Sequence, residues 1–527
     1  MDAQAENQLI QDAYGDLDRT ALIANNRELI QQNHYLQHQI DQLKRMIFGQ
    51  RSERHVSPNP HQLTLGEGLS PTASDEPPDA QQTITYQRGK AKKQRGDDCE
   101  TDSGLRFSDN VEVKTIRLSP PEIEGLDESD YDIVDTRVSH RLAQRPASYL
   151  VLRYESPVIK LKDSGQLVTP PAAPNVFERS LADVSFLVGL LVDKFQYHLP
   201  LYRQHQRLTQ AGVQLSRGTL TQLVQRTASL LNPIVDAQQQ SILRSRVLAM
   251  DETPIKAGKS KKTRGKLHQG YYWPLYGDQD EILFTYSNSR ARSVIETVLH
   301  KDFKGTLLSD GYKAYASYVK QTEGLVHAQC WAHTRRKFFE AKDSEPALVD
   351  TVLQAIQRLY QNEQQIRETE LTGEAKREYR LEHSLPVVNA LFEWVERQLQ
   401  DKALLPKDPF TKALGYLHER KAELMVFLED PEVAIDTNHL ERALRPIPMG
   451  RKAWLFCWSE IGAQHVGVIQ SLIATCKLQG IDPYVYLTDV LKRIDQHPNK
   501  DIDELIPRIW KTTFANNPLR SDLYDAV

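Results

Sequence analysis

The sequence predicts a multidomain chain of mixed α+β and α/β class, built around an α/β core. Apolar runs of strand length between 245 and 330 alternate with helical patterns, as expected for such a core. Short runs of alternating apolar and polar residues at 108–170 predict a small β module. Residues 345–430 are rich in Glu, Gln, Leu and Arg and nearly lack β-branched runs, which predicts a helical insertion in the core.

Domain boundaries follow from changes in composition and periodicity along the chain, whose length of 527 residues is typical of about three or four domains. We expect, in order, a coiled-coil helix at 1–54, a flexible basic linker at 55–107, the β module at 108–175, a helical region at 176–240, the α/β core at 241–344 and 431–460 with the helical insertion at 345–430, and a C-terminal helical region at 461–527.

The composition excludes several classes of protein. Hydrophobic residues make up 40% of the chain and charged residues 26%, which is ordinary for a soluble globular protein. No apolar run approaches the roughly 20 residues of a membrane span, and the polar, acidic N-terminus is unlike a secretory signal. Four cysteines without paired spacing fit a reducing compartment. We therefore expect a cytoplasmic protein with no membrane partner.

Acidic and basic residues nearly balance, but the basic residues cluster. The net charge is −4, which argues against a uniformly basic surface. Local clusters lie at 88–95, 256–266 and 333–337. Clusters of this kind bind nucleic-acid phosphates when they share one surface, although each one alone also fits a solvated loop.

A heptad of leucines marks the N-terminal segment. Leu at d with Asn and Ile at a favours a parallel two-stranded coiled coil, in which Asn sets register and a dimeric state. We expect a homodimer or higher oligomer through 19–54; a lone amphipathic helix packed on its own domain is the alternative. Five prolines and few large apolar residues at 56–82 predict a flexible linker. The d positions are Leu22, Leu29, Leu36 and Leu43, and the a positions are Asn26, Asn33, Ile40 and Ile47.

The region 180–232 has the pattern of a helix-turn-helix. Asp183 is placed to cap a first helix, Pro200 to begin a second, Gly212 to end it and Ser216 to open a third. In this motif the third segment would be the recognition helix. We expect its first residues, Arg217 and Thr219, to reach base edges. A helical hairpin that does not touch DNA is the alternative.

Two aspartates follow predicted strands of the core. Asp251 comes after Val-Leu-Ala-Met and Asp310 after Thr-Leu-Leu-Ser. We expect Glu252 to point to the opposite face of the sheet, because strand side chains alternate, and Gly311 to leave room for substrate. Acids that converge from distant parts of a chain hold Mg²⁺, which prefers a few carboxylates together with water and substrate phosphate. A cap or turn role is the alternative for either Asp alone.

A third acid lies in the segment DTNHLERALRP, which predicts a helix over 436–447. At helical spacing Glu441 shares a polar face with Arg442 and Arg445, opposite a leucine stripe. An acid beside two arginines suits a metal ligand flanked by phosphate contacts. A surface helix with a Glu–Arg pair is the alternative.

The order of three strands, a helix, and then alternating strand and helix is that of a ribonuclease-H-like core. Several stretches also resemble the IS66-type transposases. These stretches are LKRMIFGQRSER, KFQYHLPLYRQHQRLTQAGVQLSRGTL, MDETPIK, LLSDGYKAY, HAQCWAHTRRKF and the long segment from DTNHLERALRPIPMGRKAW to LQGIDPYVYLTDVL, which together span nearly the whole chain.

The resemblance implies a ribonuclease-H-like DDE catalytic domain in a bacterial mobile-element protein. It carries the catalytic and metal-binding roles onto Asp251, Asp310 and Glu441, with Mg²⁺ as the cofactor and Mn²⁺ as an alternative. The implied function is DNA transposition: binding of double-stranded element ends and target, strand cleavage and strand transfer. Small accessory proteins of the same element are implied as partners.

One feature of the resembling proteins is missing. They usually carry a zinc module with paired cysteines after the linker, but here only Cys99 lies in that region. A structural zinc needs about four N or S ligands, so we expect no zinc and a β module in a degenerate zinc-finger position. Cys330 and His333 have a C-x₂-H spacing, yet we expect the cysteines to be packed in the interior.

The basic clusters border the predicted acid site. We therefore expect DNA contacts there, with Trp454 either stacked on an unpaired base or buried. The expected contacts, besides Arg442 and Arg445, are Lys261, Lys262, Arg335, Arg336, Lys337, Arg451, Lys452 and Trp454.

Two other functions are compatible with these features. One is a ribonuclease-H-like nuclease that cuts without strand transfer, and the other is a catalytically silent, transposase-derived DNA-binding protein. Intact acids at all three positions argue against the silent protein. Terminal inverted repeats flanking the gene would separate a transposase from a nuclease.

Overall fold

The computed structural model describes residues 23–30, 32–33, 36–37, 40, 105–107, 111–145, 148–260, 266–300, 303–401, 404–454, 457 and 459–525. The chain divides into two compact units, Met1–Gly96 with Asp401–Asp408 and Asp97–Gln400 with Pro409–Val527. In the first unit the described residues between 23 and 40 are helical, and Leu29, Leu36 and Ile40 are exposed. The heptad positions Leu22, Leu43 and Ile47 lie outside the described residues, so the coiled coil stays a prediction.

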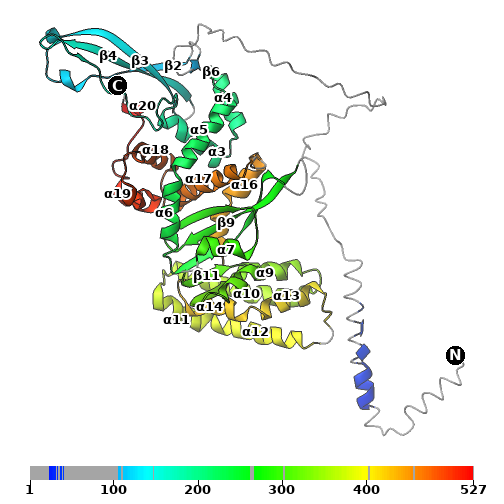
Figure 1. Cartoon of the computed structure of the whole chain (residues 1–527). Helices are drawn as coiled ribbons and strands as arrows, with labels where there is room; N and C mark the ends of the chain where they lie inside the picture. Colours follow the sequence, from blue (N-terminus) through cyan, green and yellow to red (C-terminus); the bar gives the residue numbers. More distant parts are fainter. Residues whose placement is uncertain are drawn as a thin grey trace, which may run out of the picture. The chain divides into compact units, whose positions relative to one another are not determined.

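A mixed six-stranded sheet forms the centre of the second unit (Figure 1). Its strands are β7 (Val247–Met250), β8 (Thr253–Lys259), β9 (Leu267–Gly277), β10 (Glu281–Ser287), β11 (Gly305–Ser309) and β12 (Leu325–Gln329). They are ordered β10-β9-β7-β11-β12, with β8 also paired to β9. The β9 strand is antiparallel to its neighbours, whereas β7, β11 and β12 are parallel. The α+β class predicted from the sequence is confirmed.

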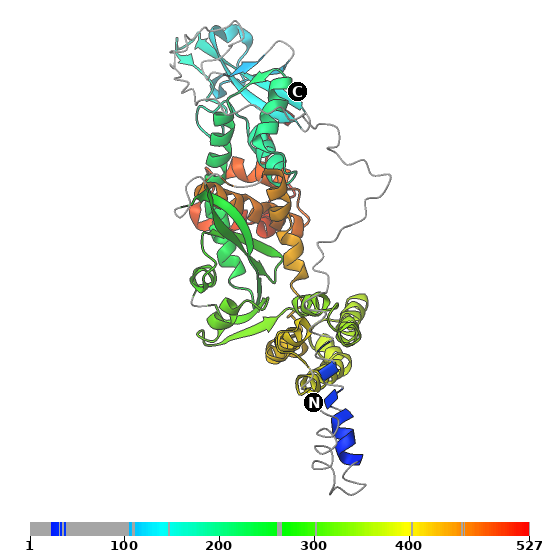
Figure 2. The ribbon, with the colours of Figure 1, turned by 90° about the vertical axis from the view of Figure 1, so that its right-hand side faces the viewer.

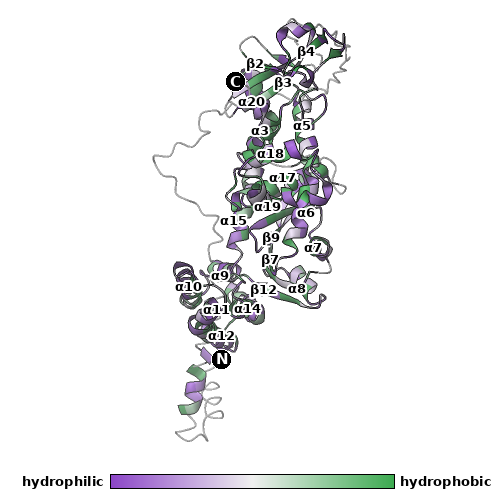
Figure 3. Ribbon diagram, turned by 90° about the vertical axis from the view of Figure 1, so that its left-hand side faces the viewer, coloured by the Kyte–Doolittle hydropathy of each residue, from purple (hydrophilic) through white to green (hydrophobic). Residues whose placement is uncertain are grey.

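The outer edge of β10 is covered by α17 (Glu460–Leu478). The Phe284 N–H donates to the Ser471 hydroxyl at 2.8 Å, and the Ile282 N–H donates to the Thr475 hydroxyl at 3.1 Å. Gly467 permits this approach, because a Cβ there would lie 2.3 Å from the Phe284 carbonyl oxygen. Side chains of α17 thus satisfy the backbone of an edge strand, which would otherwise be open to pairing. Apolar residues gather along α17 and α3 (Val184–Phe195) (Figure 3).

The helices α7 (Arg292–Leu299) and α8 (Lys313–Val319) precede and follow β11 in sequence.

Residues between β12 and the third predicted acid are helical. After β12 come α9 (Trp331–Glu340), α10 (Pro346–Glu368), α11 (Gly373–His383), α12 (Leu385–Leu399), α13 (Pro409–His418) and α14 (Lys421–Glu429). The α14 helix packs on β12, and α9 contacts α10 and α13. The helices of this segment lie together as one group (Figures 1 and 2).

A buried arginine ties these helices to the chain that leads back to the core. Arg380 is fully buried and pairs with Glu363 through Nε and Nη2, both at 2.8 Å. Its Nη1 donates to the carbonyls of Phe427, Asp430 and Val433 at 2.6, 3.2 and 3.1 Å. A buried charge is stable only when it is fully paired, so Arg380 fixes the path of the chain before the third acid.

The helix expected over 436–447 is α15 (Asn438–Leu444), which ends just before Pro446 because proline cannot donate the next helical hydrogen bond. A second helix that the sequence pattern did not suggest, α16 (Pro446–Trp454), follows at once. The chain then forms α17 and α18 (Pro483–Arg493), and a 3₁₀ segment, Asn499–Leu505, leads to α19 (Pro507–Thr513) and α20 (Asp522–Asp525).

Four helices precede the core: α3, α4 (Leu201–Gln210), α5 (Arg217–Leu230) and α6 (Asn232–Ile242). The first three have the predicted capping residues. Asp183 caps α3 by accepting the Ser185 N–H at 2.8 Å, and Ser216 caps α5 by accepting the Thr219 N–H at 3.0 Å. Gly212 has a φ of +85°, a left-handed conformation that glycine adopts without strain. The α4–turn–α5 arrangement predicted from these signals is present.

The β module consists of β2 (Glu112–Arg117), β3 (Tyr131–Arg145), β4 (Ser148–Leu161) and β5 (Leu167–Val168), with short 3₁₀ turns at Pro121–Ile123 and Glu128–Asp130. The β4 strand lies between β2 and β3. A separate two-stranded pair joins β1 (Arg106–Phe107) to β6 (Val213–Gln214).

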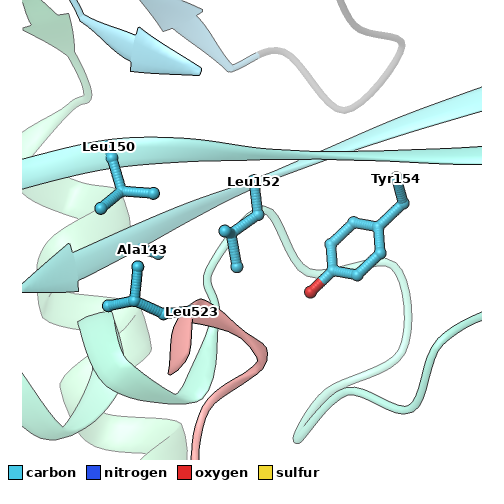
Figure 4. Close-up of a cluster of buried hydrophobic side chains, with 5 residues drawn as sticks. All are labelled: Ala143, Leu150, Leu152, Tyr154 and Leu523. Carbon is cyan, nitrogen blue, oxygen red and sulfur yellow. The ribbon is translucent and has the colours of Figure 1, made fainter. Parts of the chain in front are cut away.

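The C-terminal segment closes the core of the β module (Figure 4). Leu523 is only 2% exposed and packs with Leu150 and Leu152. Beside it, the Tyr154 hydroxyl donates to Asp522 Oδ2 at 2.9 Å, and Lys492 Nζ donates to Asp522 Oδ1 at 2.8 Å. The last helix therefore packs on a module from a distant part of the sequence. Tyr154 and Asp522 are 368 residues apart along the chain. Among the described residues, none of the helices is long and apolar enough to span a membrane.

Candidate active site

Asp251 and Asp310 stand side by side at the ends of adjacent parallel strands. Thr306 pairs with Val247 in register, and the pairing continues to Leu308 opposite Ala249. Asp251 and Asp310 each come two residues after this last pair, directly after Met250 and Ser309. Met250 and Ser309 are both fully buried. The carboxyl ends of parallel strands meet at one edge of a sheet, and this edge is where open α/β sheets bind ligands.

Asp251 lies in a strongly anionic environment. Burial raises the pKa of its carboxyl from 3.8 to about 7, the Glu252 N–H opposes this by donating to Oδ1 at 2.7 Å, and the charges of Glu252, Asp310 and Glu441 raise it further. In the absence of a cation, this carboxyl therefore ionises near neutral pH rather than near pH 4.

Asp310 is held by the loop that follows β11. Its Oδ1 accepts the Tyr312 N–H at 2.9 Å. The expectation that Gly311 leaves room for substrate is wrong, because a Cβ at this position would lie 2.2 Å from the Tyr416 hydroxyl. Glycine is required here for the close packing of Tyr416, from α13, against the Asp310 loop. The Arg420 guanidinium stacks on the same tyrosine, 3.9 Å from its ring centre.

Glu441 is brought to the site by the contact between α15 and the start of α9. Thr437, the residue before α15, donates through its N–H and its hydroxyl to the Cys330 sulfur, each at 3.3 Å. The Trp331 N–H donates to the Ile435 carbonyl at 3.1 Å. One consequence is that His333 Nε2 lies 3.9 Å from Glu441 Oε1. Cys330 is thus a buried packing residue, as expected, and so are Cys457 and Cys476.

The three acids line one pocket of about 620 Å³. The same pocket is lined by four arginines, and its space is large enough for a phosphodiester. The complete lining is Asp251, Glu252, Thr253, Arg290, Asp310, His333, Arg336, Asn438, Glu441, Arg442, Leu444, Arg445 and Pro448.

Glu252 departs from the sequence prediction. It was expected on the opposite face of the sheet from Asp251, but it lines the same pocket. Alternation of side chains holds only within a strand, and β7 ends at Met250 while β8 begins at Thr253. The two acids therefore lie in the break between strands. Arg290 donates to Glu252 from Nε at 2.8 Å and also from Nη2, and the Tyr315 hydroxyl donates at 2.8 Å.

The predicted DNA contacts divide into two groups. Arg336, Arg442 and Arg445 line the pocket. The others do not: Arg335, Lys337 and Lys452 are exposed, Arg451 donates to the Pro254 carbonyl, and Trp454 is half-buried with its indole against Gly450. Lys261 and Lys262 lie outside the described residues.

At the helix-turn-helix, Arg217 is exposed at the first turn of α5, and its guanidinium lies 5.8 Å from the centre of the Tyr202 ring. The Thr219 hydroxyl lies 2.9 Å from the Ser216 hydroxyl, so it takes part in the helix cap. Neither residue lines the pocket of the three acids.

Sequence reasoning missed Arg290, which lies in a stretch, SNSRARS, without a periodic pattern. His333 was considered only as a zinc ligand and as the first residue of the basic cluster at 333–337. Its spacing from Arg336, one helical turn, was the available sign that both face the same side of α9.

Carboxylate oxygens are the donors that Mg²⁺ and Mn²⁺ prefer, and Asp251, Asp310 and Glu441 offer them around one pocket. Burial and, to a smaller extent, the neighbouring acids raise the pKa of Asp251, and a bound cation would offset both effects by stabilising the carboxylate. The donor set therefore fits a hard divalent ion. In the conformation described, and within the described ranges, no three His, Cys, Asp or Glu side chains are gathered closely enough to hold a metal ion.

Comparison with known proteins gives matches along most of the chain. Residues 179–465 match the model of the transposase IS66 family, residues 471–508 the IS66 C-terminal element, and residues 35–98 a model described as transposase C of IS166 homeodomain.

Three uncharacterized proteins of Sinorhizobium fredii are similar. The protein y4hP is 28% identical over 513 residues, 91% of this chain and 89% of its own length. The protein y4qI is 29% identical over 408 residues, 74% of each chain. The protein y4jD is 28% identical over 511 residues, 90% of this chain and 94% of its own length. Because the first family model alone covers more than half of the sequence, the chain belongs to the IS66 family of transposases.

Proposed function

We propose that the chain is a DNA transposase that binds the ends of its mobile element and catalyses metal-dependent strand cleavage and strand transfer. The observation that carries this proposal is the convergence of Asp251, Asp310 and Glu441, from two strands and a helix, on one pocket lined by arginines. Family membership supports the same activity.

A ribonuclease-H-like core is part of the proposal. Three antiparallel strands, β10, β9 and β7, are extended by two parallel ones, β11 and β12. The helix α7 lies between β10 and β11 in sequence. We assign the core to 241–344 and 431–460, with the helices of 345–430 as an insertion, and keep the other boundaries proposed from the sequence.

In the proposed mechanism, Asp251, Asp310 and Glu441 would hold Mg²⁺, with Mn²⁺ as an alternative. The bound ions would activate the attacking oxygen and stabilise the leaving oxygen of a phosphodiester. Arg336, Arg442 and Arg445 bind and orient phosphates, since a planar guanidinium matches a phosphate with paired hydrogen bonds. His333, beside Glu441, is placed to exchange a proton with a group at that carboxylate.

End recognition is assigned to α5, where Arg217 is exposed for base contacts, while Lys261, Lys262, Arg335, Lys337, Arg451 and Lys452 are proposed phosphate contacts. Trp454 remains a proposed stacking contact. The match of 35–98 to a model that is described as a homeodomain adds a second candidate DNA-binding segment. That segment includes most of what sequence analysis interpreted as linker. Oligomerisation through 19–54 and help from accessory proteins remain part of the proposal.

The test is a cleavage and strand-transfer assay on duplexes that carry the element ends. Asp251→Ala, Asp310→Ala and Glu441→Ala should each abolish both reactions while end binding is retained, because metal ligands serve the reaction and basic groups serve affinity. Asp343→Ala, an exposed acid just beyond α9, is the matched control and should be active. Cleavage by Asp310→Ala at the wild-type rate would refute the assignment.

A further inference from the structure

The pocket holds a fourth acid, Glu252, whose side chain is only 3% exposed. Both of its oxygens are already engaged. Oε1 accepts from Arg290, and Oε2 accepts from the Tyr315 hydroxyl at 2.8 Å. Tyr315 is itself fully buried. Glu252 is therefore held in a fixed position beside Asp251, and it would have to break these bonds to bind anything else.

Arg290 connects this acid to the loop of the second aspartate. Its guanidinium stacks on the Tyr312 ring, 4.3 Å from the ring centre. Its carbonyl accepts the Tyr312 hydroxyl at 2.8 Å, and the Tyr312 N–H in turn donates to Asp310 Oδ1 at 2.9 Å. Arg290 thus contacts the residue after Asp251 and the residue two positions after Asp310.

Three loops meet at this arginine, those after β7, β10 and β11. Two of them carry a proposed metal ligand, and only the loop after β10, which supplies Arg290, carries none. The distance between two carboxylates that share metal ions must be held closely, and such positions are set by residues that lock the ligands from outside.

We propose that Arg290 and Glu252 form a positioning pair that fixes Asp251 relative to Asp310, with Glu252 kept out of metal coordination by its bonds to Arg290 and Tyr315. This inference rests on the proposed function. Without Arg290, Glu252 is a buried carboxylate free to turn toward the metal ions, and the Asp310 loop loses its contact with the Asp251 segment.

The pair is tested with Arg290→Met, Glu252→Gln and the double variant. Arg290→Met should bind Mn²⁺ at least as tightly as the wild type by calorimetry, because a cation is removed and a carboxylate is freed. It should nevertheless cleave end DNA at least a hundredfold more slowly. Glu252→Gln retains an acceptor for Arg290 and should slow cleavage less than tenfold. In the double variant, Mn²⁺ affinity should fall below that of Arg290→Met, and cleavage should recover at least tenfold.

The control is Arg292→Met, which removes the same charge two residues along, where Arg292 pairs with Glu296 outside the pocket. It should change neither readout. Weaker Mn²⁺ binding by Glu252→Gln alone, by tenfold or more, would make Glu252 a metal ligand and overturn the proposal. Loss of end-DNA affinity in Arg290→Met, without rescue by Glu252→Gln, would make Arg290 a phosphate contact and overturn it too.

The Mn²⁺ titrations need no DNA substrate. The order of Mn²⁺ affinities among the wild type and the variants therefore tests the positioning pair even if the wild-type protein does not cleave element ends. That failure would instead refute the proposed function.

Discussion

Replacing Asp251 by Asn should stabilise the metal-free protein above neutral pH while removing its activity. The carboxylate is half-buried near three other acids, and desolvation raises its pKa from 3.8 to about 7. Asn keeps the acceptor for the Glu252 N–H, which donates at 2.7 Å, but carries no charge. The wild type loses stability when this carboxyl ionises, and the variant does not.

The magnitude follows from the shift in pKa. One unit corresponds to about 1.4 kcal/mol, so ionising Asp251 in the folded state costs up to about 4 kcal/mol. Because the folded pKa is the higher one, the stability due to the protonated group is complete below pH 3.8 and is lost as the pH rises to about 7. The advantage of Asp251→Asn should therefore grow between pH 5 and pH 8.

The assay is thermal unfolding in the presence of a chelator, across this pH range, with the exposed Asp343→Asn as control. Asp251→Asn should melt several degrees above the wild type at pH 8 and closer to it at pH 5. Added Mn²⁺ should stabilise the wild type more than the variant. A variant that melts at or below the wild-type temperature at pH 8 in chelator would refute the raised pKa of Asp251.

Three further predictions concern the parts around the core. Deleting residues 1–54 should lower the mass measured by light scattering if the leucine heptad holds the oligomer, and an unchanged mass would place the interface elsewhere. Arg217→Ala should lose about 1–3 kcal/mol of affinity for the element end and little for scrambled DNA; equal losses on both would make α5 a non-specific surface. Leu523→Ala should cost about 2–4 kcal/mol of stability. It should melt at a lower temperature than the control Leu519→Ala, because Leu519 is 39% exposed. Equal melting temperatures would argue against the C-terminal closure of the β module.

The neighbouring aspartates were predictable because their signal is local. A short apolar strand followed by Asp places a carboxylate at a sheet edge, and two such strands, at Asp251 and Asp310, pair in register. The caps at Asp183 and Ser216 were predictable for the same reason, since a cap depends on residues within one turn.

The rest of the site depends on contacts between distant residues. Arg290 and Glu252 are 38 residues apart, and no periodic pattern links them. The face of the sheet on which Glu252 lies was mispredicted because β7 ends at Met250, just before Asp251. The alternation of apolar and polar residues does not show where a strand ends. The role of the helical insertion is also hidden in the sequence, because Arg380 reaches carbonyls 47 to 53 residues away.

The most direct test of the central claim is a change in metal preference at one proposed ligand. A thiolate is a softer donor than a carboxylate and suits Mn²⁺ better than Mg²⁺. Asp310→Cys should therefore cleave element-end DNA with Mn²⁺ but not with Mg²⁺, whereas the wild type and Asp343→Cys should use both ions. Cleavage by Asp310→Cys in Mg²⁺ at the wild-type rate would contradict the assignment of Asp310 as a metal ligand.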